Sequence, residues 1–535
     1  MVSQNIPTIL EKNTTLRFDC IDRMYMNHYC PLIQTGGGAA YFFKNIRNMP
    51  VPSSTLMKQM TDVYLKATDE FIKRHQIEKI RFEPKQRKDD ITQEKLSLHN
   101  GSEGVLYVGV AQEKVKTLRS KACVNDQTGK SYSWLDSSTA YVNQYYWYIF
   151  DEDFGPLFYK QSSYFPYTAR LCINGHEYVK RQLEKRGITY EALDNGIYSC
   201  EQPGVLAEIA NTITSERIEK LLEKWKSILP NPFTQADYDN GLRQEISMLQ
   251  TEFASTNVFD KPINGRILFE NIIKENIQLG RPENMSLIFD RRITKRTPGQ
   301  FSTRIVTHGV TPAISAHYKT SRIKQYFKEQ KALRTETVVN NTRDLKTGRK
   351  LENLDKLKSA AFAMNERLIN FEKISQDCMQ GYQVMSELSQ PTQKNNQRAS
   401  GLKFADVRTM ALLHALCMAY ILLGEFSNRE LRQWVAQFLH LKFDDYTQNQ
   451  MTYDLRRLVM HGIIVKIKGR NKYQLTEQGI GISLYYTKVH ENLFLPSIAE
   501  ITDDFPELKN RKVKSALKQF EKIIGEQRDA LKISA

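Results

Sequence analysis

Three consecutive acids, Asp151, Glu152 and Asp153, stand between two aromatic runs in the segment IFDEDFGPLFYK, residues 149–160. Asp151 and Asp153 are two residues apart, so in an extended strand their side chains project to the same side. Paired carboxylates of this kind bind Mg²⁺ or Mn²⁺ and support metal-dependent phosphodiester cleavage. We therefore take Asp151 and Asp153 as candidate catalytic residues and as candidate metal ligands.

Further residues could assist such chemistry, and Asp89 and Asp90 of RKDD are one possible pair. Glu113 and Lys114 end the strand-like run VLYVGVAQEK, and its Gln-Glu-Lys end resembles a strand end of restriction-type nucleases. The resemblance is partial, because the complete pattern of those enzymes, a Pro-Asp followed by an acidic-x-Lys pair, is not present. His176 follows an Asn-Gly turn and precedes a basic helix, where a general base would suit phosphodiester cleavage. Glu113, Lys114 and His176 therefore join the candidate catalytic residues.

Each of these residues also has a purely structural interpretation. The runs YYWYIF and PLFYKQSSYF are strand-like, and DEDFGP between them contains the Asp, Gly and Pro typical of turns. The segment is therefore predicted to be a β-hairpin, whose acids need be no more than polar turn residues. A single histidine without a second one nearby in sequence is commonly structural as well.

The charge of the chain indicates a polyanionic partner. The formal net charge is +16, and residues 291–350 contain fifteen bases and three acids, a balance of +12. Such a field attracts nucleic acid, DNA or RNA, and aromatic side chains among the bases can stack on nucleobases. The alternative is a solvated face that only keeps the protein in solution. The candidate nucleic-acid-binding residues of this segment are Arg291, Arg292, Lys295, Arg296, Lys319, Arg322, Lys324, Tyr326 and Arg334.

Several common functional classes are not supported by motifs. The seven cysteines contain no Cys-x-x-Cys and there is no HExxH, so no zinc site is expected. The glycines of QTGGGAAYFFKNIR are not followed by Gly-Lys-Ser/Thr, so no nucleotide cofactor is expected, and a turn capped by Thr35 is predicted instead. No apolar run approaches a membrane span and the N-terminus does not resemble a signal peptide, so a cytoplasmic protein without a membrane partner is predicted.

The elements that must position these residues form a multidomain α+β pattern. Strand-like and helix-like stretches alternate in the first half, a mixed α/β body is predicted there, and a basic region follows. The polar segment LSQPTQKNNQRASG is the best linker. The predicted divisions are an N-terminal mixed α/β domain at 1–120, an aromatic-rich α+β domain at 121–285, the basic region at 286–387, the linker at 388–401, a helical domain at 402–490 and a basic helical tail at 491–535.

Residues 402–490 resemble a winged-helix domain. Three helix-like segments are followed by the strand IIVKI, the turn KGRN and the strand KYQLT, and the second helix opens with a Ser427–Glu430 capping box. The resemblance implies that the third helix enters a DNA groove while the hairpin contacts the backbone. Arg456 and Arg457 would then face the groove, with Lys468, Arg470 and Lys472 on the wing. Protein contact, or a homodimer through this domain or the tail, is the alternative.

Several phrases, among them RKDD, DEDFGP, INGHEY, LGRPENMSLIFDRR and MTYDLRRL, together resemble a family of uncharacterised bacterial proteins of about this length. The resemblance implies a bacterial origin and a mobile-element or defence context, and it carries no activity. Two functions therefore stay open. The first is a metal-dependent nuclease or strand-transfer enzyme with a winged-helix reader. The second is a non-enzymatic nucleic-acid binder, such as a transcriptional regulator or a ribonucleoprotein component.

Overall fold

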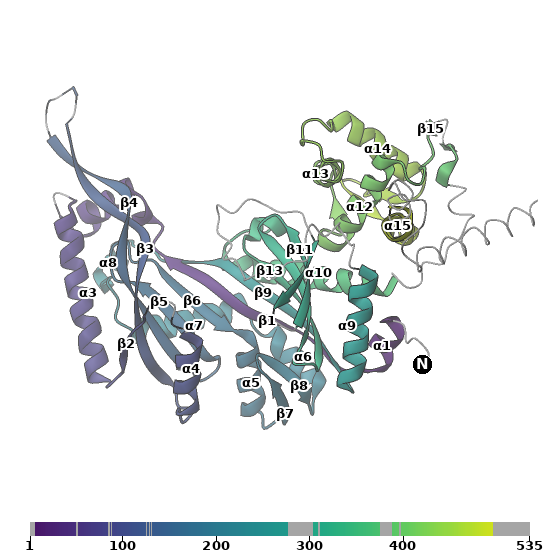
Figure 1. The fold of residues 1–535 in the computed structure, drawn as a ribbon. Helices are drawn as coiled ribbons and strands as arrows, with labels where there is room; N and C mark the ends of the chain where they lie inside the picture. The colour runs from purple at the N-terminus through teal and green to yellow at the C-terminus, as the bar shows by residue number, and fades with distance from the viewer. Residues whose placement is uncertain are drawn as a thin grey trace, which may run out of the picture.

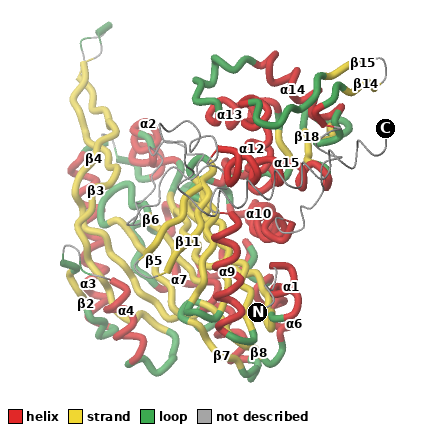
Figure 2. The backbone as a smooth tube through the Cα atoms, turned by 45° about the vertical axis from the view of Figure 1, so that its right-hand side comes forward, coloured by secondary structure: helices red, strands yellow, loops and turns green. Residues whose placement is uncertain are grey.

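The computed structural model describes residues 6–49, 52–83, 86, 88–124, 126–127, 129, 131–276, 303–308, 311–374, 388–394 and 397–495. Within them, a mixed eleven-stranded sheet organises the body (Figures 1 and 2). Its order is β10-β11-β12-β13-β9-β1-β6-β5-β4-β3-β2, and all neighbours are antiparallel except β2 and β3. The strands are β1 (Thr14–Tyr29), β2 (Lys79–Arg81), β3 (Gly104–Val124), β4 (Ser131–Asp151), β5 (Gly155–Ser162), β6 (Ala169–Asn174), β9 (Glu245–Phe259), β10 (Thr303–His308), β11 (Thr311–Tyr318), β12 (Ser321–Lys328) and β13 (Ala332–Val339).

One sheet contains strands from all three segments that the sequence suggested as separate units before the linker. The suggested division at residue 120 falls inside β3, and β9 of the second segment pairs with β13 of the third. The mixed α/β character of the body agrees with the prediction. The predicted domain boundaries do not coincide with the sheet, because strands that are far apart in sequence, such as β1 and β9, are neighbours in it.

Helices cover the sheet on its apolar sides. Helices α1 (Ile6–Lys12), α9 (Pro262–Asn276) and α10 (Leu354–Ile374) enclose a cluster that includes Phe327 of β12 and Leu333 of β13. Toward the other end of the sheet, α3 (Ser54–Arg74) places Phe71 edge-on against Trp147 of β4, with ring centres 5.8 Å apart. The remaining body helices are α2 (Gly36–Tyr41), α4 (Lys88–Ser97), α5 (Gly175–Lys185), α6 (Pro203–Asn211), α7 (Ser215–Ile228) and α8 (Gln235–Asp239), and a small hairpin is formed by β7 (Tyr190–Leu193) and β8 (Gly196–Cys200).

The C-terminal helices lie near β11 (Figure 2), and their core includes Ala316 and Tyr318 of β11 and Ile323 of β12. The chain forms α12 (Val407–Leu422), β16 (Glu425–Phe426), α13 (Asn428–Phe438), α14 (Gln448–Met460), β17 (Ile464–Lys466), β18 (Tyr473–Leu475) and α15 (Glu477–Val489). The short strands form a sheet in the order β16-β18-β17. The predicted Ser427–Glu430 capping box is confirmed, and Gly462, with a φ of 73°, follows the end of α14.

The predicted linker is docked onto the C-terminal helices. It contains the hairpin of β14 (Thr392–Lys394) and β15 (Gln397–Ala399), which contacts α14. A Cβ atom at Gly401 would lie 1.9 Å from the Ser389 carbonyl oxygen, so the close return of the chain requires glycine there. In the part of the chain that the structure describes, no helix combines the length and the apolar character needed to span a membrane. The predicted tail from residue 496 onward lies outside that part.

Candidate functional site

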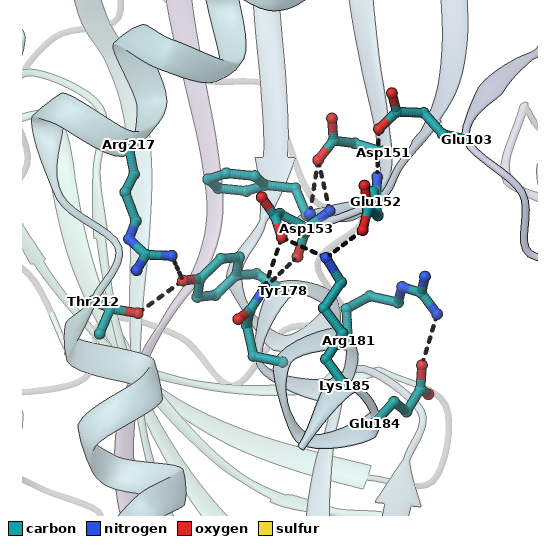
Figure 3. Close-up of polar contacts among 12 residues, drawn as sticks. Glu103, Asp151, Glu152, Asp153, Tyr178, Arg181, Glu184, Lys185, Thr212 and Arg217 are labelled. Atoms are coloured by element: carbon teal, nitrogen blue, oxygen red, sulfur yellow. Dashed lines mark hydrogen bonds and ion pairs between the residues drawn. The ribbon is translucent and has the colours of Figure 1, made fainter. Parts of the chain in front are cut away.

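The acids Asp151, Glu152 and Asp153 lie at a β-hairpin tip, as the turn interpretation predicts (Figure 3). Asp151 ends β4 and is buried. One of its carboxylate oxygens accepts hydrogen bonds from the amides of Asp153 and Phe154, at 2.9 and 3.0 Å. The other oxygen accepts from Trp225 Nε1 at 2.8 Å and from Lys224 Nζ at 2.9 Å. Asp151 therefore closes the turn and ties it to α7.

Asp153 has different surroundings from Asp151. Its exposed carboxylate accepts from Lys185 Nζ at 2.7 Å, and the same ammonium lies 3.0 Å from Glu152 (Figure 3). The hydrogen bond from Lys185 holds the pKa of Asp153 below its usual value. Asp151 turns inward while Asp153 binds α5, so the two carboxylates do not share a space for an ion. The geometry does not support the predicted metal pair.

The predicted helpers also lie away from this tip. Glu113 pairs across the strands with Val142, nine residues from Asp151 along β4, which is roughly 30 Å. The Glu113 carboxylate binds Lys160 Nζ at 2.5 Å and the Tyr146 hydroxyl. Burial of the ammonium lowers the pKa of Lys160 to about 8. Lys114 projects from the opposite face of β3 and is exposed, so Glu113 and Lys114 do not act on one site.

His176 is buried at the start of α5 and belongs to a different cluster. Its Nε2 accepts a hydrogen bond from Arg334 of β13, so Nδ1 carries the proton of the neutral ring. Burial and the adjacent guanidinium lower the pKa of His176 well below its usual value. Arg334 also donates to the Asn195 carbonyl at 2.5 Å and lies 3.1 Å from Asp22 of β1. The structure thus unites a predicted catalytic residue with a residue predicted to bind nucleic acid.

A β-bulge explains how Asp22 enters this cluster. Ile21 pairs with Phe253 and Met24 with Thr251, so Asp22 and Arg23 of β1 stand opposite one residue of β9, Glu252. Bulges re-aim side chains and are common next to functional sites. Here Asp22 is only 3% exposed, whereas Arg23 next to it is exposed.

Three carboxylates from three adjacent strands converge at the bulge. One oxygen each of Asp22, Glu252 and Glu336 lies within 4.8 Å of the others. Burial, and then the charge of Glu336, raise the pKa of Glu252 to about 7. Burial opposes the charge of Asp22 as well, but the Arg334 guanidinium, the hydrogen bond from Asn195 and other neighbours together outweigh it and hold the pKa of that carboxyl below its usual value. We call these three residues the carboxylate cluster.

Two more predicted nucleic-acid-binding residues border the carboxylate cluster. Lys324 of β12 stands opposite Glu336 in the sheet, and its ammonium lies 3.0 Å from that carboxylate. Tyr326 donates its hydroxyl hydrogen to Glu336 at 3.2 Å, and Lys324 lies over its ring at 5.4 Å. The arrangement can hold a proton or a cation between carboxylates, and it presents half-buried Lys324 and Tyr326 beside them.

The sequence did not point to the three carboxylates of this cluster, although Asp22 and Glu336 each leave a trace. Asp22 follows Leu16, Phe18 and Cys20 at the even positions of an otherwise apolar strand face. Glu336 lies with Arg334 on alternate positions of a strand that is buried throughout. A charged residue on a buried strand requires a partner, and that partner cannot be read from local sequence.

The remaining predicted residues of the basic segment have mixed outcomes. Arg291, Arg292, Lys295 and Arg296 lie outside the described residues. Lys319, at a turn with a φ of 55°, lies over the Tyr318 ring at 4.9 Å, and Arg322 is half-buried on β12. Arg334 requires a correction, because a side chain 1% exposed and enclosed by Asp22 and His176 cannot meet nucleic acid at the surface.

Predictions for the C-terminal residues also divide. In α14, Leu455 and Leu458 are buried, and Arg456 is exposed as predicted. Arg457 requires a correction, since it is buried and donates to the carbonyls of Ser400 and Gly401, which fastens the predicted linker to α14.

The hairpin that follows α14 exposes its turn. Lys468 lies there and is exposed, as is Arg470. Arg470 and Lys472 also approach Glu425 of β16, at 3.9 and 3.0 Å.

No protein-family model, no curated protein and no solved structure matches this chain. The family resemblance suggested by sequence phrases therefore stays a prediction.

Proposed function

We propose that this protein binds nucleic acid and that its C-terminal domain is a winged-helix reader. The observation that carries the proposal is the exposure of Arg456 on α14 together with that of Lys468 and Arg470 in the following hairpin. In a winged helix the third helix contacts base edges and the wing contacts the phosphate backbone. The order α12-β16-α13-α14-β17-β18-α15 supports this assignment.

The charge of the whole chain supports the same proposal. A formal net charge of +16 favours association with polyanions, a class that includes phosphate backbones. Two contacts hold α14 on its buried side. Asp454 pairs with Arg408 at 2.7 Å, and Arg457 donates to the Gly401 carbonyl. Arg456 is thereby presented on a helix that the rest of the domain positions.

Binding to a duplex by full-length variants tests the assignment. Arg456→Ala removes a groove contact, which costs ~1–3 kcal/mol when the contact reads a base. Arg186→Ala is a matched control, because Arg186 is an exposed arginine of the body that follows α5. We expect Arg456→Ala to weaken duplex binding at least about tenfold and Arg186→Ala to leave it unchanged. Equal affinities of both variants and the wild type would make the domain a protein-contact module.

A second candidate function is metal-dependent cleavage or transfer of phosphodiesters in the body. The carboxylate cluster favours it, because three carboxylate oxygens from three strands could hold Mg²⁺ or Mn²⁺ beside an exposed arginine, Arg23. The contacts of Lys324 and Arg334 support the non-enzymatic alternative, since these cations already balance Glu336 and Asp22. Metal binding and cleavage by cluster variants distinguish these alternatives.

A further inference from the structure

The β3-β4 hairpin is longer than the sheet that it joins. Its strands pair without a register shift from Tyr107–Tyr148 to Val124–Ser131, whereas β5 pairs with β4 only from Gln144 to Asp151. Figure 1 shows the outer part of the hairpin projecting from the body, with no described helix beside its tip. Twenty-one residues in each strand thus form an arm as well as an edge of the sheet.

One face of the arm is docked onto the body. Leu118 and Leu135 are buried in a cluster with residues of α2 and α3. The hydroxyl of Ser120 lies 2.7 Å from that of Ser54 at the start of α3. A Cβ atom at Gly36 would lie 1.6 Å from the Leu135 carbonyl oxygen, so this glycine allows α2 to pack directly on β4. The TGGG sequence at residues 35–38 therefore allows close packing between α2 and the arm.

The opposite face of the arm, which we call the outer face, carries cations and rings, with one acid, Asp136, across the strands from Arg119. Side chains alternate between the faces of a strand, so Arg119, Lys121, Tyr132 and Trp134 all lie opposite to Leu118 and Leu135. Lys121 stands across the strands from Trp134. Both cations are exposed, and Tyr132 and Trp134 are 50% and 42% exposed.

The spacing of these rings suits a nucleobase. Residues two apart on one strand face are separated by roughly 7 Å, and stacked bases are separated by about 3.4 Å. A base therefore fits between Tyr132 and Trp134, while Lys121 and Arg119 reach the neighbouring phosphates. We propose that the outer face binds unpaired bases of a nucleic acid strand, an inference that rests on the proposed nucleic-acid function.

Tryptophan fluorescence can report this contact directly. The protein has four tryptophans, and Trp147, Trp225 and Trp434 are all buried, so Trp134 alone is exposed to solvent. Adding oligothymidylate, or oligouridylate as the RNA counterpart, should quench the solvent-exposed component of the emission. The variant Trp134→Phe keeps a ring for stacking, so it should still bind while losing most of this quenching.

Affinity measurements with matched variants complete the test. The double variant Tyr132→Ala with Trp134→Ala should weaken oligothymidylate binding about tenfold or more, since each stacked base is worth ~1–3 kcal/mol. Tyr141→Ala is the control, because Tyr141 is 68% exposed on the docked face of the same hairpin. That control should change the affinity less than about twofold.

The outcomes separate this inference from the function on which it rests. Wild-type protein that binds neither single strands nor duplexes would refute the nucleic-acid function itself. Wild-type protein that binds oligothymidylate with unchanged Trp134 emission, and equally well without both rings, would refute only the inference. Stronger quenching by a duplex than by oligothymidylate would make the arm a groove-binding ribbon instead. Light scattering that shows a wild-type dimer and a monomeric double variant would make it an interface between copies.

Discussion

The guanidinium of Arg334 lies 3.1 Å from the carboxylate of Asp22, although β9 separates their strands in the sheet. This buried contact joins the first strand of the chain to the predicted basic segment. Burial, and then the same guanidinium, which donates to the histidine Nε2, keep His176 neutral by lowering its pKa. Arg334, which the sequence predicted to bind nucleic acid, instead stabilises buried groups inside the protein.

Removing the cation of this ion pair should destabilise the protein more than removing both charges together. Arg334→Met leaves Asp22 buried without its cation, which we expect to lower the free energy of unfolding by ~3–5 kcal/mol. Adding Asp22→Asn to that variant removes the uncompensated charge and should restore part of the loss. Urea unfolding of the wild type, both single variants and the double variant measures the coupling. Additive effects would show that the two residues do not depend on each other.

The protonation of Glu252 should make stability depend on pH. Its pKa is about 7 in the folded protein and 4.5 as the ordinary value, so the folded state holds this proton longer than the unfolded state. Its contribution to stability therefore falls as the pH rises from about 4.5 to about 7. Glu252→Gln should be relatively more stable, by ~1–3 kcal/mol, at pH 8 than at pH 5. An effect that is the same at both pH values would contradict this account.

Metal ions distinguish the carboxylate cluster from the hairpin tip. If the cluster holds Mg²⁺ or Mn²⁺, millimolar metal should raise the Tm of the wild type at pH 8 but not that of Glu252→Gln with Glu336→Gln. Any metal-dependent cleavage of nucleic acid should be lost in the same variant. Asp153→Asn should leave both properties unchanged. A wild type whose Tm and nucleic acid substrates are unaffected by metal would favour the non-enzymatic function.

The two aspartates of the tip should differ sharply in stability. Asp151→Ala removes a buried acceptor of four hydrogen bonds and leaves Trp225 and the turn amides unpaired, so a loss of ~2–4 kcal/mol is expected. Asp153→Ala loses an exposed ion pair with Lys185, worth no more than ~1 kcal/mol. Thermal or urea unfolding of the pair measures the difference. Equal losses would mean that the two carboxylates share one role.

Local features were predictable from sequence, and features that join distant segments were not. The hairpin at Asp151, the cap of Thr35 on Gly38 and the capping box at Ser427 each depend on a few neighbouring residues. The bulge at Asp22 depends on pairing with β9, more than two hundred residues later. Arg457 shows the same limit, because it was predicted to face the groove, whereas in the structure it is buried and donates to the carbonyl of Gly401.

The salt dependence of nucleic-acid affinity tests the central claim most directly. Fluorescence anisotropy of the full-length protein with labelled oligothymidylate, a random duplex and a structured RNA gives the dissociation constants. Raising the NaCl concentration from ~50 to ~200 mM should weaken binding ~40-fold or more if the preferred ligand is the duplex, and ~20-fold or more if it is the single strand, as expected for three or more neutralised phosphates. An affinity for every nucleic acid that is undetectable at the lower salt concentration, or independent of salt, would contradict the proposed function.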